Sequence, residues 1–327
     1  MLKNFRATIR QVESSSNFFY GDDILTDTDW SEHYIKRGDP TKPTYYIIRR
    51  RDPAVGLFSN FIVFAGHIRY ALANGWLPVV DMQNYPNAYL PPEKFGKENS
   101  WEYYFEQPLH IGLKEAYSGE NIILCGEKIF IPDGMNFLEN RDNSLMEWRM
   151  LVKFGLLRVK AERVKEVLAV RQKLFAPSDR VLGVLLRGTD YIAMRPYQHP
   201  IPPPTEFAAS VVVEKLKEWH CNKIFLATED KNIMQIFKSV FGDLCVTFDR
   251  EYVDYKAGQK ISLVHIDRPN DHFQQGKDYL TQTVLLSMCN SFVAARCSGT
   301  TGVMMLAENF EHTYFFNLGR YGMISLG

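Results

Sequence analysis

The 327-residue sequence carries no net charge, because 38 Lys and Arg residues balance 38 Asp and Glu residues. Proteins that bind nucleic acids through their phosphates usually carry a basic excess. The balance therefore argues against a nucleic-acid partner and requires any anion site to be local. Hydrophobic residues make up 46% of the chain and charged residues 23%, as in ordinary globular proteins, which excludes global disorder.

Cysteine is scarce: the five cysteines are odd in number and include no C-x-x-C pair. This argues against a disulfide framework and a structural zinc site, and it favours buried free thiols in a reducing compartment. The sequence also lacks a run of about 18 apolar residues, which a membrane-spanning helix needs. Residues 1–20 lack the continuous apolar stretch of a signal peptide. We expect a cytoplasmic protein with at most peripheral contact at the inner face of a membrane.

Several catalytic fingerprints are missing as well. No G-x-G-x-x-G follows a strand, which disfavours a nicotinamide dinucleotide enzyme, and the G-x-x-x-x-G-K-[ST] of P-loop nucleotidases is absent. The sequence contains no H-E-x-x-H either. One D-x-D occurs, Asp27-Thr28-Asp29, but it lies in a polar leader rather than after an apolar strand, so we expect no metal site.

Strands and helices alternate in two halves of the chain, as in doubly wound parallel sheets. In the first half, the expected elements are strands at 45–50, 77–81 and 121–125 and helices at 59–74 and 141–176. In the second half, they are strands at 181–186, 223–227, 245–248, 292–295 and 313–317 and helices at 205–219, 232–241, 278–289 and 301–309. Ala176-Pro177 breaks the long helix, so we expect domains at 1–176 and 177–327.

Polar residues follow the strands of the second half, at the strand ends where parallel sheets bind ligands. They are residues 187–191, 228–230, 249–250 and 296–302. Arg187 leaves a buried strand, and a buried charge must be paired or meet an anion. Its planar guanidinium suits phosphate oxygens, and an ion pair with Asp190, Glu229 or Asp230 is the structural alternative.

A second candidate for anion binding is the segment Ser298–Gly302 (SGTTG). Its glycines permit close approach of the backbone, and a helix N-terminus follows. An ordinary cap and tight turn would give the same pattern. Two other features have a structural interpretation first. His67 lies beside apolar residues of a predicted helix, which indicates a structural role. The aromatic residues Trp101, Tyr103, Tyr104 and Phe105 are expected in the hydrophobic core, and stacking on a sugar ring is the second interpretation.

Four segments form a recognisable set: VLGVLLRGTDY at 181–191, His199-Pro200, KIFLATED at 223–230, and LLSMCNSFV at 285–293 with SGTT at 298–301. As a set they resemble the donor domain of the GDP-fucose-dependent fucosyltransferases, namely the α1,6-fucosyltransferases and protein O-fucosyltransferases. The turn GLFSN at 56–60 resembles the Gly-rich turn of their first domain more loosely. The same segments also resemble glycosyltransferases of bacterial capsule loci.

The resemblance implies an α/β fold of the GT-B-like type, with two Rossmann-type domains whose parallel sheets face a crevice. The first domain would bind the acceptor and the second the nucleotide-sugar donor. The implied reaction is inverting, metal-independent transfer of fucose from GDP-fucose to a hydroxyl of a glycan or lipid-linked oligosaccharide, in surface polysaccharide synthesis. The donor is a substrate, and no cofactor is implied.

Carried over by motif, Arg187 would bind the β-phosphate, and Ser298, Gly299 and Thr300 the diphosphate. Asp190, Glu229 and Asp230 are candidates for the general base. The remaining residues predicted to bind the donor are Asn60, Thr189, Tyr191, His199, Thr228, Asp278, Gln282, Arg296 and Thr301.

The sequence departs from the family at three positions. Leu185 stands where many members have a histidine, Gly188 where many have a second arginine, and Gln282 where some have an acid that reads guanine. A nucleotide-sugar diphosphate remains the predicted donor class. A non-catalytic nucleotide or sugar-phosphate binding protein is the alternative, since a fold does not determine a function.

Overall fold

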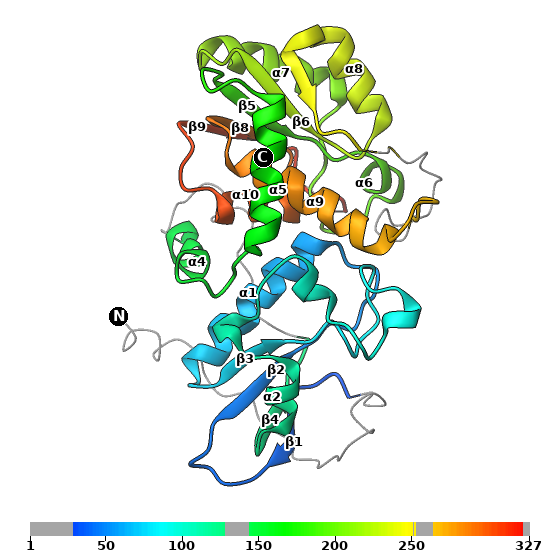
Figure 1. The fold of residues 1–327 in the computed structure, drawn as a ribbon. Coiled ribbons are helices and arrows are strands. Elements are labelled where there is room, and N and C mark those ends of the chain that lie inside the picture. The colour runs from blue at the N-terminus through cyan, green and yellow to red at the C-terminus, as the bar shows by residue number, and fades with distance from the viewer. Residues whose placement is uncertain (1–28, 128–143, 251, 253–263, 323–327) are drawn as a thin grey trace. The chain divides into compact units, whose positions relative to one another are not determined.

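The computed structural model describes residues 29–127, 144–250, 252 and 264–322, and the chain separates into two compact units (Figure 1). Unit 1 consists of Met1–Asp133 and Met146–Lys160, and unit 2 of Gly134–Leu145 and Ala161–Gly327. Each unit contains one sheet. The predicted α/β class with parallel sheets is confirmed.

Unit 1 is built on a four-stranded sheet in the order β1-β4-β2-β3. Its strands and α-helices are β1 (His33–Arg37), β2 (Thr44–Ile48), α1 (Leu57–Ala73), β3 (Leu77–Val80), α2 (Leu113–Ser118), β4 (Asn121–Leu124) and α4 (Ser144–Lys153). Three 3-10 helices lie between β3 and α2, at Pro92–Lys94, Ser100–Tyr103 and Pro108–His110. β2 is parallel to β3 and β4, whereas β1 is an antiparallel edge strand.

The two faces of this sheet are covered by different helices, because successive side chains of a strand point to opposite faces. Ile47 and Val79 share a buried cluster with Leu113 of α2. Tyr46, on the other face, contacts the rings of His67 and Tyr70 on α1. The sheet therefore lies between α1 and α2, which leaves its carboxyl edge to the segments that follow β2 and β3.

Unit 2 is built on a five-stranded sheet, all parallel, in the order β7-β6-β5-β8-β9. Its elements are α5 (Ala161–Leu174), β5 (Val181–Leu185), α6 (Thr189–Met194), α7 (Thr205–Glu218), β6 (Lys223–Ala227), α8 (Lys231–Phe241), the 3-10 turn Gly242–Leu244, β7 (Cys245–Thr247), α9 (Asp271–Ser287), β8 (Ser291–Ala294), α10 (Ser298–Leu306) and β9 (His312–Phe315). The all-apolar central strand β5 is buried throughout, as expected for a strand covered on both faces.

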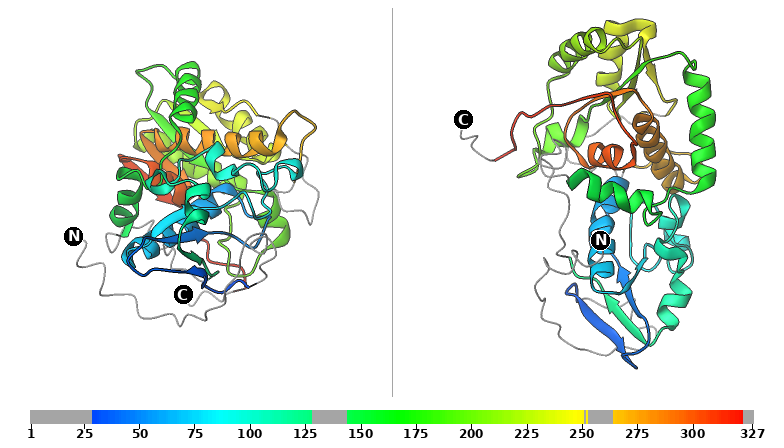
Figure 2. Two further views of the ribbon diagram at one scale, coloured as in Figure 1. Left: turned by 60° about the horizontal axis from the view of Figure 1, so that its bottom comes forward. Right: turned by 90° about the vertical axis from the view of Figure 1, so that its left-hand side faces the viewer.

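Helices pack on both faces of this second sheet. Leu182 and Val184 of β5 share a buried cluster with Val212 of α7 and Phe237 of α8. On the other face, α9 approaches so closely at Gly183 that an added Cβ would lie 3.1 Å from the side chain of Leu286. Figure 2 shows α5 alongside α9, with which it is in contact.

The structure differs from the sequence prediction in several places, and short helices such as α2 and α6 were not expected. The expected helix at 141–176 is two helices, α4 and α5, separated near Gly155, which has a φ of 74° that interrupts a helix. Because α5 packs on α9, the division between units falls at Lys160/Ala161 rather than at 176/177. α9 begins at Asp271 instead of 278, and the edge strand β1 was not expected.

Candidate functional site

The carboxyl edge of the unit 2 sheet gathers most of the predicted site residues. Arg187 follows β5, residues 228–230 follow β6 and Arg296 follows β8. β5 lies between β6 and β8 in the sheet. Since these strands are parallel, the three segments emerge at one edge, where open α/β sheets bind ligands.

Arg187 has an acidic and an aromatic neighbour. Its Nε lies 3.9 Å from Oε1 of Glu229, and its guanidinium carbon lies 4.3 Å from the ring centre of Tyr191. The side chain is 21% exposed. Of the ion pairs considered from sequence, the one with Glu229 is present, but its distance exceeds that of a hydrogen bond. A long pair of this kind holds the cation beside Glu229 at the carboxyl edge of the sheet.

Tyr191 and His199 extend this cluster. Their ring centres are 5.4 Å apart at an angle of 81°, the edge-to-face geometry that aromatic rings favour. The backbone of the His199 turn exchanges hydrogen bonds with the segment after β9, from Gln198 N to Tyr321 O at 2.9 Å and from Tyr321 N to His199 O at 3.0 Å. The structure thus brings Arg187, Tyr191 and His199 together.

The carboxylates predicted as general bases have different surroundings. Oδ1 of Asp230 accepts hydrogen bonds from the backbone of Asn232 and Ile233, at 2.8 and 3.2 Å, and so caps α8. The buried hydroxyl of Thr228 accepts from the Asp230 N–H at 3.1 Å. The side chains of Thr189 and Asp190 lie outside what the structure describes. Asp230 and Thr228 therefore shape the loop, and Glu229 is the carboxylate beside Arg187.

Gly188 explains one departure from the family pattern. A Cβ at this position would collide with the carboxylate of Asp230, whose cap of α8 fixes it in place. A second arginine after Arg187 is therefore incompatible with this loop.

The N-terminus of α10 follows β8 directly. Cys297 is its N-cap residue and provides no side-chain cap, and the first helical backbone bond runs from Thr301 N to Cys297 O at 3.2 Å. The preceding N–H groups, those of Ser298, Gly299 and Thr300, thus have no partner within the helix, and such groups at a helix N-terminus favour an anion.

The first-turn side chains of α10 divide into two groups. Ser298 and Cys297 are half-buried, whereas Thr300 and Thr301 are buried. The Thr300 hydroxyl donates to Ala295 O at 2.5 Å and lies 3.4 Å from the Cys297 sulfur. The Thr300 hydroxyl is therefore already engaged, and the backbone N–H of Thr300 is the group that could donate to a ligand. A Cβ at Gly299 would lie 2.6 Å from the Tyr279 hydroxyl, so glycine fits this position without displacing that hydroxyl.

Asp278 and Gln282 both lie on α9 and both contact arginines. Asp278 Oδ2 accepts a hydrogen bond from Arg268 Nη1 at 2.9 Å. Gln282 Oε1 accepts one from Arg250 Nη1 at 3.2 Å. Gln282 is 5% exposed, and its Nε2 has no hydrogen-bond partner among the described residues.

Arg250 was not among the predicted donor-binding residues, although it follows β7 as Arg187 follows β5. That position after a strand was the signal in the sequence. Asp278, by contrast, is already neutralised by Arg268, which also donates from Nε to Asp271 Oδ1 at 2.7 Å. Gln282 is therefore the better placed of the two predicted α9 residues to offer a free donor.

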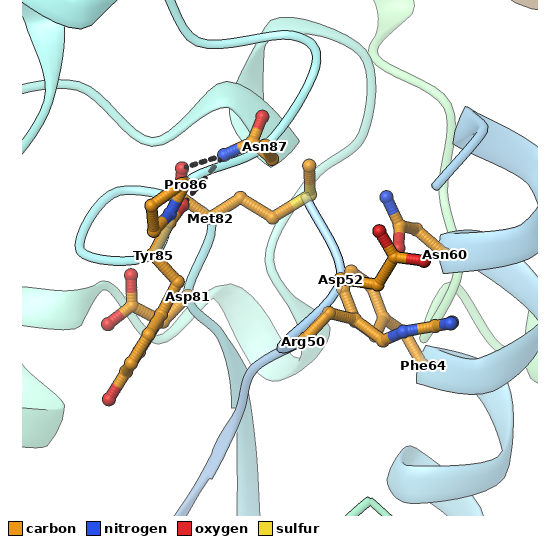
Figure 3. A pocket seen from close by; sticks show the side chains of 9 residues that line it. All are labelled: Arg50, Asp52, Asn60, Phe64, Asp81, Met82, Tyr85, Pro86 and Asn87. Carbon is orange, nitrogen blue, oxygen red and sulfur yellow. Dashed lines mark hydrogen bonds between the residues drawn. The ribbon is translucent and has the colours of Figure 1, made fainter. Parts of the chain in front are cut away.

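Asn60, the predicted residue of the first half, lies in unit 1. It is on α1, is 2% exposed, and its Oδ1 has no hydrogen-bond partner within the described part of the chain. It lines a small cleft (Figure 3). The other lining residues are Arg50, Asp52, Phe64, Asp81, Met82, Tyr85, Pro86 and Asn87.

The structural interpretation is confirmed for His67 and for three of the four aromatic residues, whereas Tyr103 is half-buried. His67 is buried and its Nδ1 lies 3.1 Å from the Tyr46 hydroxyl. Trp101 and Phe105 are fully buried and stack with ring centres 4.3 Å apart. Tyr104 is buried as well.

Neither a metal cluster nor a membrane span is found in the part of the chain that the structure describes. No group of three His, Cys, Asp or Glu residues there could hold a metal ion. No helix there is long and apolar enough to cross a membrane. Of the D-x-D, Asp27 and Thr28 lie outside the described residues, and Asp29 Oδ1 accepts from Ser31 N at 2.8 Å.

Comparison with solved structures identifies the fold. POFUT1 in its apo form matches with a TM-score of 0.51 at 10% identity, over 85% of this chain and 99% of that chain. POFUT1 in complex with GDP matches with a TM-score of 0.50 at 12% identity and the same coverage. The chain has the fold of the GDP-fucose-dependent fucosyltransferases. The resemblance seen in the motifs is confirmed at this level.

A third solved structure, the fucosyltransferase NodZ from Bradyrhizobium, matches with a TM-score of 0.49 at 16% identity, over 86% of this chain and 98% of that chain. No protein-family model matches the sequence, and no curated protein matches it significantly.

Proposed function

We propose that the protein is a glycosyltransferase that moves a sugar from a nucleotide-diphosphate donor to a hydroxyl of a glycan or lipid-linked oligosaccharide. GDP-fucose is the first candidate donor. The observation that carries the proposal is that Arg187 follows β5 and the N-terminus of α10 follows the neighbouring parallel strand β8, so both lie at one carboxyl edge. A fold likeness to a POFUT1 structure with bound GDP supports it.

The chemistry requires breaking the bond between the anomeric carbon and the diphosphate oxygen. The electron pair leaves with the diphosphate, so negative charge develops there in the transition state. The Arg187 guanidinium would stabilise it together with the N–H groups of Ser298 and Gly299, and such electrostatic stabilisation is a large term in catalysis. We propose that these groups replace a metal ion.

The acceptor oxygen forms the new bond and gives up its proton to a base. Glu229 is the preferred base, because one Asp230 oxygen already caps α8; Asp190 is the alternative. Attack opposite the departing diphosphate would invert the anomeric carbon. The donor would be surrounded by Tyr191, His199, Thr228 and Arg296. Gln282 would contact the nucleobase of the donor.

We further propose that unit 2 is the donor domain and unit 1 the acceptor domain. Asn60 of unit 1 would contact the sugar of the donor. A role in surface polysaccharide or capsule synthesis, and a cytoplasmic location with at most peripheral membrane contact, stay predictions of the sequence.

A thermal-shift panel of nucleotides and nucleotide sugars tests the donor. At about 100 times its dissociation constant, a true donor should stabilise the fold by about 2.7 kcal/mol. We expect GDP and GDP-fucose to give the largest shifts, and donor turnover to survive excess chelator. A larger shift with UDP or CMP removes fucose from the proposal. Binding without any hydrolysis or transfer would favour the non-catalytic alternative.

A further inference from the structure

Arg250 and Gln282 form a polar pair at the carboxyl edge of the unit 2 sheet. Arg250 follows β7, and Gln282 lies on α9 with only 5% of its surface exposed. The contact between them runs from Arg250 Nη1 to Gln282 Oε1 at 3.2 Å. It engages the amide oxygen, which is the one acceptor atom of the two side chains, since a guanidinium has donors alone. The Arg250–Gln282 pair therefore has N–H donors left for a third group.

Two of these donors are buried without a partner. Arg250 Nε and Gln282 Nε2 make no hydrogen bond within the part of the chain that the structure describes. Buried polar atoms in native structures almost always have a partner, because leaving one unpaired costs free energy. Two such donors on side chains that contact each other favour a ligand with two neighbouring acceptors.

The direction of α9 brings Gln282 to the edge where ligands bind. This helix precedes β8, which is parallel to β5, so it runs antiparallel to the strands and begins at their carboxyl ends. Leu286 of α9 packs over Gly183 in the middle of β5. Gln282 lies about one helical turn before Leu286 and is therefore nearer to the carboxyl edge.

The pair is separated from the proposed diphosphate site by about the length of a nucleoside. β6 lies between β5 and β7, and at about 4.8 Å per strand Arg187 and Arg250 leave the sheet about 10 Å apart. Gln282 is three residues after Tyr279, so the two are neighbours on the surface of α9. The Tyr279 hydroxyl lies beside Gly299 in the first turn of α10. A ligand held at the N-terminus of α10 can thus extend along α9 to the Arg250–Gln282 pair.

A neutral acceptor suits this pair better than a second phosphate. Gln282 is almost fully buried, and placing a phosphate beside it would remove a highly charged group from water. The amide of Gln282 carries no charge to offset that cost. A carbonyl oxygen or a ring nitrogen accepts hydrogen bonds from an amide and from a guanidinium without introducing a charge.

Nucleobases differ in whether they offer two such acceptors side by side. Guanine and hypoxanthine both carry O6 next to N7, the edge that arginine most often contacts. Adenine has an amino donor in place of O6, so it would set a donor against a donor. Uracil has no N7, and its O4 lies next to an N–H donor. The 2-amino group that distinguishes guanine from hypoxanthine is itself a donor, and the unpaired donors of the pair cannot bind it.

We infer that Arg250 and Gln282 recognise the O6 and N7 edge of a 6-oxopurine base and do not recognise the 2-amino group of guanine. This deepens the proposed function and rests on it for the presence of a nucleotide. The two residues then determine base specificity: they select guanine over adenine and uracil, and they accept hypoxanthine in place of guanine.

A panel of four nucleoside diphosphates tests this on the full-length protein. GDP, inosine diphosphate, ADP and UDP share the ribose and the diphosphate and differ only in the base, so calorimetry of the wild type compares the bases directly. We expect inosine diphosphate to bind within about fivefold of GDP. ADP and UDP should bind at least about tenfold more weakly, as for the loss of a two-point contact to a base edge.

Two variants assign the discrimination to the pair. Gln282→Glu is nearly isosteric, keeps an acceptor for Arg250 and replaces the amide donor by a carboxylate. It should weaken GDP and inosine diphosphate about tenfold and leave ADP no weaker. Arg250→Lys keeps the charge of a half-buried side chain but loses Nε, and it should lower the preference for GDP over ADP in the same direction. The matched control is Gln235→Glu, the same change at an exposed position of α8, which should leave all four affinities unchanged.

The inference is overturned if inosine diphosphate binds more than about fivefold more weakly than GDP, or if ADP or UDP binds as tightly as GDP. It is also overturned if the preference for GDP over ADP stays at the wild-type value in both Gln282→Glu and Arg250→Lys, or if Gln235→Glu lowers it equally. Should Gln282→Glu not fold, Arg250→Lys and the wild-type panel decide. Failure of the proposed function looks different: wild type then binds none of the four nucleotides, whereas failure of the inference alone leaves GDP bound without the expected base preference.

Discussion

In unit 1, the charged residue that follows β3 is enclosed by its own neighbours. Asp81 accepts four hydrogen bonds from backbone and side chains. In unit 2, Arg187 follows β5, forms a long ion pair with Glu229 and lies against the ring of Tyr191. Both charges lie at the carboxyl edge of a parallel sheet. A charge saturated by the fold stabilises that fold, whereas the proposed function assigns Arg187 to a ligand.

The largest expected effect is on Arg187. Arg187→Ala should lower donor turnover by about 10²–10³-fold, because it removes one donor to the developing diphosphate charge. Arg187→Lys should recover part of this, since it keeps the charge but loses the planar fork. Steady-state kinetics and urea unfolding on the same variants measure both effects.

Arg180→Ala is the matched control for Arg187, because Arg180 precedes β5 at the opposite edge and pairs with Glu311 in an exposed bridge. It should leave turnover unchanged. A well-folded Arg187→Ala with near-normal transfer would falsify the assignment, and an unfolded one would make Arg187 a structural residue like Asp81.

Asp81→Ala should act on stability instead. Removing the carboxylate leaves the Tyr117 hydroxyl and several N–H donors without their acceptor, which should cost about 3 kcal/mol of unfolding free energy. Asp52→Ala, in the same cleft but exposed, should cost less than about 0.5 kcal/mol. Chemical denaturation compares the two. Equal losses would remove the contrast between saturated and accessible carboxylates.

A smaller effect concerns pH. Burial, helped by the nearby charge of Arg50, lowers the pKa of His67 to about 3 from 6.5. Between these values the unfolded chain binds a proton that the folded chain does not, so stability is lost as pH falls below 6.5. From about pH 6.5 to about pH 5, this site should remove about 2 kcal/mol.

The difference between wild type and His67→Gln isolates this contribution. The difference is needed because burial raises the pKa of Glu32 in the same network, despite hydrogen bonds from Tyr46 and Tyr70, and Glu32 therefore opposes the trend. Urea unfolding at both pH values is the measurement. An unchanged pH slope in His67→Gln would show that His67 is not the responsible group.

The smallest expected effect is on Asp230. Loss of its cap of α8 in Asp230→Ala should cost about 1 kcal/mol of stability, and turnover of the folded protein should change only a few-fold. Glu229→Gln should reduce turnover far more if Glu229 is the base. If Asp230→Ala reduced turnover more than Glu229→Gln, Asp230 would be the catalytic carboxylate, and capping of α8 would be its lesser role.

The sheet of unit 2 could be predicted because its strands are continuous apolar runs that end at polar residues. β5 and β6 begin and end within one residue of expectation. β1 escaped prediction because it is a short edge strand in a polar region, and its pairing with β4 spans more than eighty residues of sequence. The early start of α9 was not predicted, because its first turns are polar and lack apolar periodicity. Ion pairs with Arg268 stabilise these turns instead.

The site could be predicted one strand end at a time, but its contacts could not. The sequence left three carboxylates open as partners of Arg187, and the structure describes a pair with Glu229 while Asp230 caps a helix. The contact between Arg250 and Gln282 joins two segments that no local pattern connects. The collision that requires glycine at 188 likewise depends on a loop from the next strand.

The N-cap of α10 gives the protein a built-in reporter. Of the five free thiols, Cys125, Cys221, Cys245 and Cys289 are buried, and Cys297 alone is half-buried. Burial raises the pKa of the Cys125 and Cys245 thiols to about 11, which suppresses the reactive thiolate. A mild alkylating dye should therefore label Cys297 first, one residue before Ser298. If the N-terminus of α10 binds the diphosphate as proposed, the labelling rate would fall with occupancy and report binding without any need to observe sugar transfer.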